Sequence, residues 1–139
     1  MAHKVDLTWT GNGFAFDATT GSGKHLQVGV DGDGNPVGAR AKELVCLGVG
    51  ACAGTNLVTL MKKMRQQVER IEISVEAEQA EVDPMVFTHV ITRYRLYGKG
   101  IDPGKVTKAL DYIEEKYCGV LHMVNKTAKT EYAFEIVEV

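Results

Sequence analysis

The feature that most constrains this fold is the stretch of residues 44–61, which contains no charged side chain. The wider range of residues 39–67 is rich in alanine, leucine and methionine, and it ends in the cationic residues Lys62, Lys63 and Arg65, as is typical of a helix C-terminus. The pattern predicts one long helix over residues 39–67. Because that helix would be apolar on almost every side, one sheet cannot cover it, and we expect a homodimer in which two such helices pack together.

The same stretch just reaches the length of a membrane span. It also carries three polar residues, Thr55, Asn56 and Thr59, among several glycines and alanines, so its transfer into lipid would be unfavourable. We therefore expect a helix buried in protein and no membrane association.

Three glycines lie inside this predicted helix, Gly48, Gly50 and Gly54. Each costs a helix about 1 kcal/mol relative to alanine, so something must approach the backbone closely. A packed neighbouring element and an open pocket beside Cys52 would both explain them. The cluster does not follow a strand and lacks the spacing of a dinucleotide-binding fingerprint.

The rest of the chain alternates between polar and apolar residues in several short segments, which predicts strands. Residues 5–16 read as a hairpin that turns on Asn12-Gly13, and acidic residues of one long strand would face Arg93 and Arg95 of the next on a solvated sheet face. The remaining predicted strands are residues 26–30, 71–78, 86–96 and 131–137.

A second helix is predicted from Asp102, an N-cap that Pro103 follows at the first helical position. Apolar residues then recur at helical spacing until Gly119 breaks the pattern, and residues 120–125 form a further turn or two. The residues expected to line the buried side are Val106, Leu110, Ile113 and Tyr117.

Together these elements predict an α+β fold, a mainly antiparallel sheet packed on a long buried central helix, in a single domain of residues 1–139. The net charge of −2 offers no basic surface for nucleic acid. The odd count of three cysteines and the lack of a secretory leader favour a cytoplasmic protein.

Two cysteines have unusual settings. Cys52 lies among small residues that leave its sulfur uncovered, although a cysteine in an apolar helix is also commonly a core residue, as we expect for Cys46. If Cys118 begins the helix at residues 120–125, free backbone N–H groups would lower its pKa. Cys118 and His122 could share a helical face, but no ligand spacing typical of a metal site occurs.

The residues 43–52, ELVCLGVGAC, resemble the opening of the central helix in the OsmC/Ohr family of stress-related thiol proteins, and residues 115–118, EKYC, are similar to that family's second cysteine segment. The order of predicted elements matches over nearly the whole chain. The resemblance implies an OsmC-like fold and an intertwined homodimer with both cysteines at the subunit interface.

The resemblance also implies a peroxidase that reduces organic or inorganic hydroperoxides in oxidative-stress defence. Carried onto this chain, Cys52 is the peroxidatic thiol and Cys118 the resolving one. A small dithiol or a lipoylated protein would reduce the resulting disulfide, and no metal or other cofactor is expected.

The chain departs from the best-characterised family members around its expected activating groups. It has no arginine before Arg40, and Lys42 stands where those members place an active-site glutamate, one position before Glu43. On a continuous helix Arg40 would lie about 18 Å from Cys52, and Glu43 would point to the opposite side. Arg40, Lys42 and Glu43 could thus support Cys52 only from the other subunit or across a helix break, which places the chain nearer the OsmC-like branch than the Ohr branch.

Two other functions remain open. A non-catalytic dimeric module could use the same fold to bind a small apolar or thiol ligand. A redox sensor could form the disulfide without turnover and thereby change its binding to a partner.

Overall fold

The computed structural model describes residues 1–139. Clustering of its contacts gives two compact units, residues Met1–Val45 and Cys46–Val139, and α1 crosses the boundary between them. The single domain predicted for residues 1–139 stays a prediction. The elements are β1 (Val5–Trp9), β2 (Phe14–Thr20), β3 (His25–Val30), α1 (Ala41–Lys63), β4 (Gln67–Gln79), β5 (Phe87–Lys99), α2 (Pro103–Tyr112), the π-helical segment η1 (Ile113–Tyr117), α3 (Gly119–Val124) and β6 (Lys129–Glu138).

The first unit holds a three-stranded antiparallel sheet in the order β1-β2-β3. The predicted hairpin turn is confirmed, since the N–H of Ala15 donates to the carbonyl of Asn12 at 3.1 Å. Gly13 has a positive φ of 56°, and a Cβ there would come within 2.4 Å of the Asp31 backbone, so this turn needs glycine.

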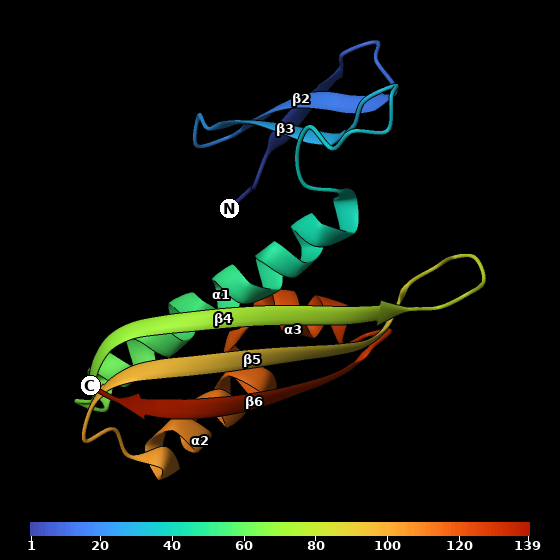
Figure 1. Ribbon diagram of the computed structural model, residues 1–139. Coiled ribbons are helices and arrows are strands. Elements are labelled where there is room, and N and C mark those ends of the chain that lie inside the picture. The colour runs from blue at the N-terminus through green and yellow to red at the C-terminus, as the bar shows by residue number, and fades with distance from the viewer. The chain divides into compact units, whose positions relative to one another are not determined.

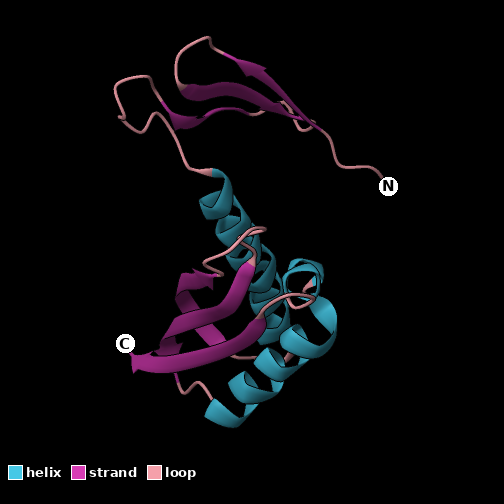
Figure 2. Ribbon diagram, turned by 90° about the vertical axis from the view of Figure 1, so that its right-hand side faces the viewer, coloured by secondary structure: helices cyan, strands magenta, loops and turns pink.

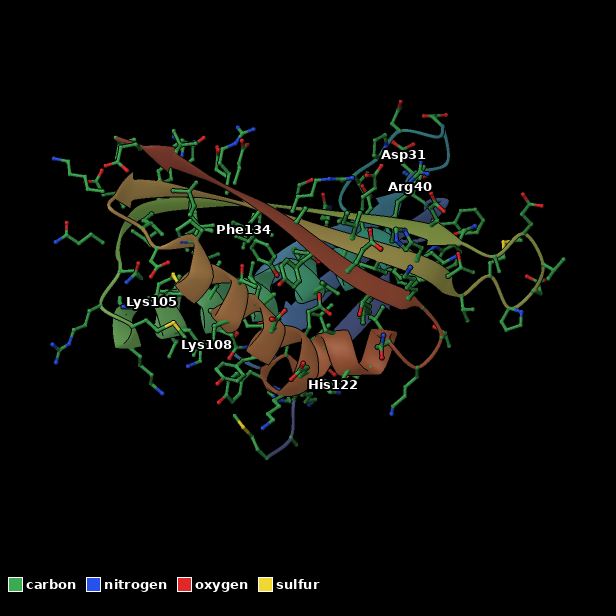
Figure 3. All side chains as sticks on the ribbon, turned by 90° about the horizontal axis from the view of Figure 1, so that it is seen from below. Asp31, Arg40, Lys105, Lys108, His122 and Phe134 are labelled. Carbon is green, nitrogen blue, oxygen red and sulfur yellow. The ribbon has the colours of Figure 1, made fainter.

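The second unit holds the sheet β4-β5-β6, and the helices cover one of its faces (Figures 1 and 2). β4 and β5 form the expected antiparallel pair, whereas β6 runs parallel to β5 because α2, η1 and α3 carry the chain back across the sheet. Phe134 of β6 lies among the side chains packed between sheet and helices (Figure 3).

The exposed face of this sheet carries the predicted cross-strand ion pairs. Arg93 binds Glu76 at 2.9 Å, and Arg95 lies 3.6 Å from Glu72. Both arginines are about half exposed, so these pairs contribute little to stability, as expected of a solvated sheet face.

One stripe of α1 enters the core at every fourth residue, and the glycines lie beside that stripe. A Cβ on Gly50 would lie 3.3 Å from Val75, and one on Gly54 would lie 2.7 Å from the tip of Ile73. Close packing of α1 on β4 therefore explains these two glycines. The core stripe consists of Val49, Ala53, Leu57 and Met61.

The predicted ends of this helix were wrong by a few residues. At the N-terminal end, the carbonyl of Ala39 accepts from the N–H of Gly29 in β3 and so is engaged outside the helix. At the C-terminal end, Arg65 adopts a left-handed φ of 57° and Gln67 already begins β4. The cationic residues extended the apparent helical pattern past its true stop at Lys63.

Tyr117 was wrongly predicted to lie on the buried side of the second helix. Val106, Leu110 and Ile113 are buried as expected, but Tyr117 is 51% exposed. The reason is η1, because a π-helical turn holds more residues than an α-helical turn. Tyr117 is therefore rotated away from the core side that α-helical spacing predicts.

By length and hydropathy alone, α1 is the one helix that could cross a membrane, with 28% of its most apolar window buried inside the protein. A core helix of a soluble protein passes the same test. Only one stripe of α1 is buried, while apolar residues such as Leu47 and Val58 are exposed, so the burial expected on almost every side is not found within this chain.

Candidate functional site

The thiols of Cys52 and Cys118 lie beside each other between α1 and the junction of η1 with α3, close enough for Cys52 to influence the pKa of Cys118. Cys118 is completely buried in the core and Cys52 packs against that core while partly exposed. Neither of them, nor Cys46, is in a disulfide. The fold thus brings together two thiols that lie far apart in the sequence.

Cys118 lies at the junction where one helical segment ends and the next begins. η1 ends with the N–H of Cys118 donating to the carbonyl of Ile113 at 3.1 Å, the i to i+5 bond of a π-helix. Cys118 then takes an extended conformation and caps α3, its sulfur accepting from the N–H of Leu121 at 3.4 Å. The predicted place of Cys118 at a helix N-terminus is therefore confirmed.

The N–H groups at that place lower the pKa of Cys118 as predicted, but a larger effect opposes them. Burial, and after it the neighbouring thiol of Cys52, raise the pKa of Cys118 to about 11. The N–H groups of Leu121 and Val120 act in the opposite direction, but they are too weak to offset the loss of solvent. The fold therefore keeps the sulfur of Cys118 protonated at neutral pH.

A buried phenol, Tyr94, lies near both thiols, and the carboxyl group of Glu114 lies near that phenol. Tyr94 of β5 is 2% exposed, and its pKa is raised by burial first, then by the nearby Glu114, Cys118 and Cys52. Burial also raises the pKa of Glu114, whose Oε2 accepts from Thr130 at 3.0 Å while Oε1 is buried without a partner. These groups make the floor of the site poorly solvated.

Asn56 lies one turn after Cys52 on α1. Its Nδ2 is 3.0 Å from the carbonyl of Cys52, 3.3 Å from the carbonyl of Tyr117 and 3.9 Å from the sulfur of Cys52. It is therefore the one side chain with a hydrogen bond to both cysteine-bearing segments.

Arg40, Lys42 and Glu43 belong to the unit Met1–Val45, whereas both thiols belong to the other unit. Within its own unit, Glu43 caps α1, since its Oε1 accepts from the N–H of Arg40 at 2.9 Å. This is half of a capping box and gives Glu43 a local structural role. Whether any of the three supports Cys52 stays a prediction.

The sequence also raised Cys118 and His122 as metal ligands. Cys118 is buried, whereas His122 is exposed on α3 (Figure 3), so their side chains do not form one site. No group of three or more His, Cys, Asp or Glu side chains gathers anywhere in residues 1–139.

Sequence reasoning missed Asn56, Tyr94 and Glu114 as parts of this site. For Asn56 a signal was present, because residues i and i+4 share a helix face and an amide one turn from Cys52 can reach the same neighbours. For Tyr94 and Glu114 there was none, since the place of Tyr94 near the thiols and of Glu114 near Tyr94 depends on segments distant in sequence packing together.

The arrangement suits thiol–disulfide chemistry. Cys52 is partly exposed, and Cys118 is buried and protonated beside it. If the exposed sulfur is oxidised, the buried one is placed to condense with it.

Comparison with known proteins agrees with this description. The family model of the OsmC-like protein matches residues 31–133. The protein YhfA of Escherichia coli strain K12 is 29% identical over 125 residues, covering 90% of this chain and 92% of YhfA.

Two solved structures share the fold. A hypothetical protein from Aquifex aeolicus VF5 matches with a TM-score of 0.87 at 23% identity, covering 100% of this chain and 98% of that one. An organic hydroperoxide resistance protein from Elizabethkingia anophelis matches with a TM-score of 0.76 at 11% identity, covering 99% and 97%. With its α+β fold and the family match over most of its length, the chain belongs to the OsmC-like protein family.

Proposed function

We propose that this protein is a thiol-dependent peroxidase that reduces organic or inorganic hydroperoxides through a cycle of sulfenic acid and disulfide. The observation that carries the proposal is the proximity of the thiols of Cys52 and Cys118 in the core, with Cys118 buried and Cys52 partly exposed. The name of the Elizabethkingia protein, an organic hydroperoxide resistance protein, adds support from within the same fold.

In the first step the Cys52 thiolate attacks the peroxide oxygen that carries hydrogen. The O–O bond breaks, the leaving alkoxide takes a proton and departs as an alcohol, or as water from hydrogen peroxide, and Cys52 becomes a sulfenic acid. The peroxide is reduced by two electrons and the sulfur is oxidised by two.

In the second step Cys118 attacks the sulfur of the sulfenic acid. An S–S bond forms, the S–O bond breaks, and the hydroxyl group leaves as water with the proton of the Cys118 thiol. An external dithiol, either a small molecule or a lipoylated protein, then reduces the disulfide and is itself oxidised. The cycle needs no metal or other cofactor.

The burial of Cys118 supports this division of roles. A thiol with a pKa near 11 is a poor attacking group toward free peroxide at neutral pH, so the accessible Cys52 suits the first step and Cys118 the second. Arg40, Lys42 and Glu43 remain the candidates for supporting Cys52, from the second subunit of a homodimer or across a break in α1. We further propose that the dimer works in the cytoplasm, without membrane or nucleic acid partners.

A stopped-flow assay with cumene hydroperoxide and dihydrolipoamide tests the proposal. The expected result is steady turnover that Cys52→Ser abolishes and Cys46→Ser leaves unchanged, since Cys46 is on the same helix but does not join the thiol pair. Turnover that survives in Cys52→Ser would overturn it. Stoichiometric formation of the disulfide without turnover would indicate a redox sensor instead.

A further inference from the structure

The peptide group that joins Tyr117 to Cys118 is held on both sides. Its N–H, from Cys118, donates to the carbonyl of Ile113 at 3.1 Å, and its carbonyl, from Tyr117, accepts from Asn56 Nδ2 at 3.3 Å. Because a peptide group is planar and rigid, fixing both ends fixes the direction in which the backbone enters Cys118. The first of these bonds is local to η1, but the second comes from α1.

The same amide nitrogen is tied to Cys52. Asn56 Nδ2 lies 3.0 Å from the carbonyl of Cys52, one turn earlier on α1. The amide group has two hydrogens, and the two carbonyls account for both. One side chain therefore links the backbone of the first cysteine to the peptide that carries the second.

The orientation of this amide follows from its neighbours. Turned the other way, Asn56 would place its oxygen against two carbonyl oxygens, which repel it, so only the nitrogen can face them. The nitrogen is also 3.9 Å from the Cys52 sulfur, near the outer limit for such a contact, and both its hydrogens are already engaged. Direct donation to the sulfur is thus secondary to the link between the two carbonyls.

We propose that Asn56 is a positioning residue that ties α1 to the η1–α3 junction and so holds the sulfurs of Cys52 and Cys118 at the separation from which they form a disulfide. The inference rests on the proposed function for its purpose, but it can be measured without any peroxide. The expected consequence of this link is a higher effective concentration of one thiol toward the other.

The test is the equilibrium between the dithiol and disulfide forms of the intact chain in glutathione redox buffers. Asn56→Leu keeps the branched heavy-atom skeleton and introduces a better helix former while removing the donor, and Asn56→Asp keeps the shape but turns a carboxylate toward the two carbonyls. Thr55→Ala is the matched control, because the Thr55 hydroxyl bonds to the carbonyl of Ala51 one turn earlier but reaches no second segment.

We expect the effective concentration to fall about three- to tenfold in Asn56→Leu, the equivalent of one ordinary hydrogen bond, and further in Asn56→Asp. Thr55→Ala should match the wild type. Thermal unfolding of the reduced proteins measures how far each substitution destabilises the fold. At a temperature where all variants are folded, the equilibrium constant for disulfide formation should be lower in the Asn56 variants than in the wild type.

The outcomes separate the two proposals. If the wild type forms no disulfide between Cys52 and Cys118 at any buffer ratio, the proposed peroxidase cycle fails, and the inference about Asn56 fails with it. If the wild type forms it and both Asn56 variants match Thr55→Ala, the positioning role is overturned while the peroxidase cycle stands.

Discussion

The two cysteines of the site come from contrasting backbones. Cys52 lies within the regular helix α1, partly exposed, among small residues and one turn from Asn56. Cys118 lies where the π-helical η1 gives way to α3, wholly buried, its sulfur capping the next helix. In this protein the regular helix leaves one sulfur accessible to solvent, whereas the irregular junction between η1 and α3 keeps the second sulfur buried as a thiol.

The largest expected effect compares the two sulfurs directly. With stoichiometric hydroperoxide at pH 7.5, Cys118→Ser should accumulate a sulfenic acid at Cys52, whereas Cys118 in Cys52→Ser should react at least on the order of a hundredfold more slowly, because little of it is thiolate. Trapping with dimedone followed by mass spectrometry measures both. Equal dimedone labelling of the two single variants would show that Cys52 and Cys118 do not differ in their reactivity toward hydroperoxide.

The second comparison concerns stability at high pH. The pKa of Cys118 rises on folding from an ordinary value of 9.0 to about 11, so the native state holds its proton more tightly than the unfolded state does. Its contribution to stability is complete below pH 9 and is lost as the pH rises to 11, by on the order of 2 kcal/mol. Denaturant unfolding should therefore show a steeper loss over this range in the wild type than in Cys118→Ala, in which Tyr94 and Tyr132 still titrate. Parallel pH profiles would mean that Cys118 is not buried as a thiol.

A third comparison tests the packing that brings α1 to the sheet. Gly50→Leu should destabilise the protein by about 1–3 kcal/mol, because even a Cβ there would lie 3.3 Å from Val75. Gly48→Ala should instead stabilise it by up to about 1 kcal/mol, since its Cβ would meet Val120 only at 3.7 Å and the helix gains alanine. Urea unfolding of the reduced proteins measures both. A stabilising Gly50→Leu would show that α1 is not closely packed at this turn.

The smallest expected effect is at the floor of the site. Burial raises the pKa of Glu114 above its ordinary 4.5, so the native state is favoured while the carboxyl is protonated and loses that advantage as the pH rises through the folded value. Glu114→Gln should therefore be more stable than the wild type at pH 7, by on the order of 1 kcal/mol or less, with the gain shrinking toward pH 4. A gain that is the same at both pH values would assign it to packing rather than charge.

Much of the fold was accessible from residue patterns, because regular elements leave regular signals. Three features were correctly identified because each leaves a local pattern in the sequence: the alternation in β4 and β5, the capping of α2 by Asp102 and the apolar length of α1. The parallel pairing of β6 was not, because strand direction depends on how the chain crosses the sheet rather than on residues within the strand.

The candidate site divides in the same way. Cys52 and Cys118 could be selected as a pair because each departs from its local pattern. The raised pKa of Cys118 could not be foreseen, because it depends on burial by segments distant in sequence, which outweighs the two backbone donors that sequence reasoning considered. The exposed position of Tyr117 depends likewise on η1, which no residue pattern predicted.

The most direct test of the account is to treat the reduced protein with one equivalent of hydroperoxide, block the remaining thiols and digest it without reductant. The account predicts that mass spectrometry finds a peptide pair joined through Cys52 and Cys118, with Cys46 alkylated. Cys52 oxidised to sulfinic acid beside an alkylated Cys118, or a disulfide that joins Cys46 instead, would contradict it.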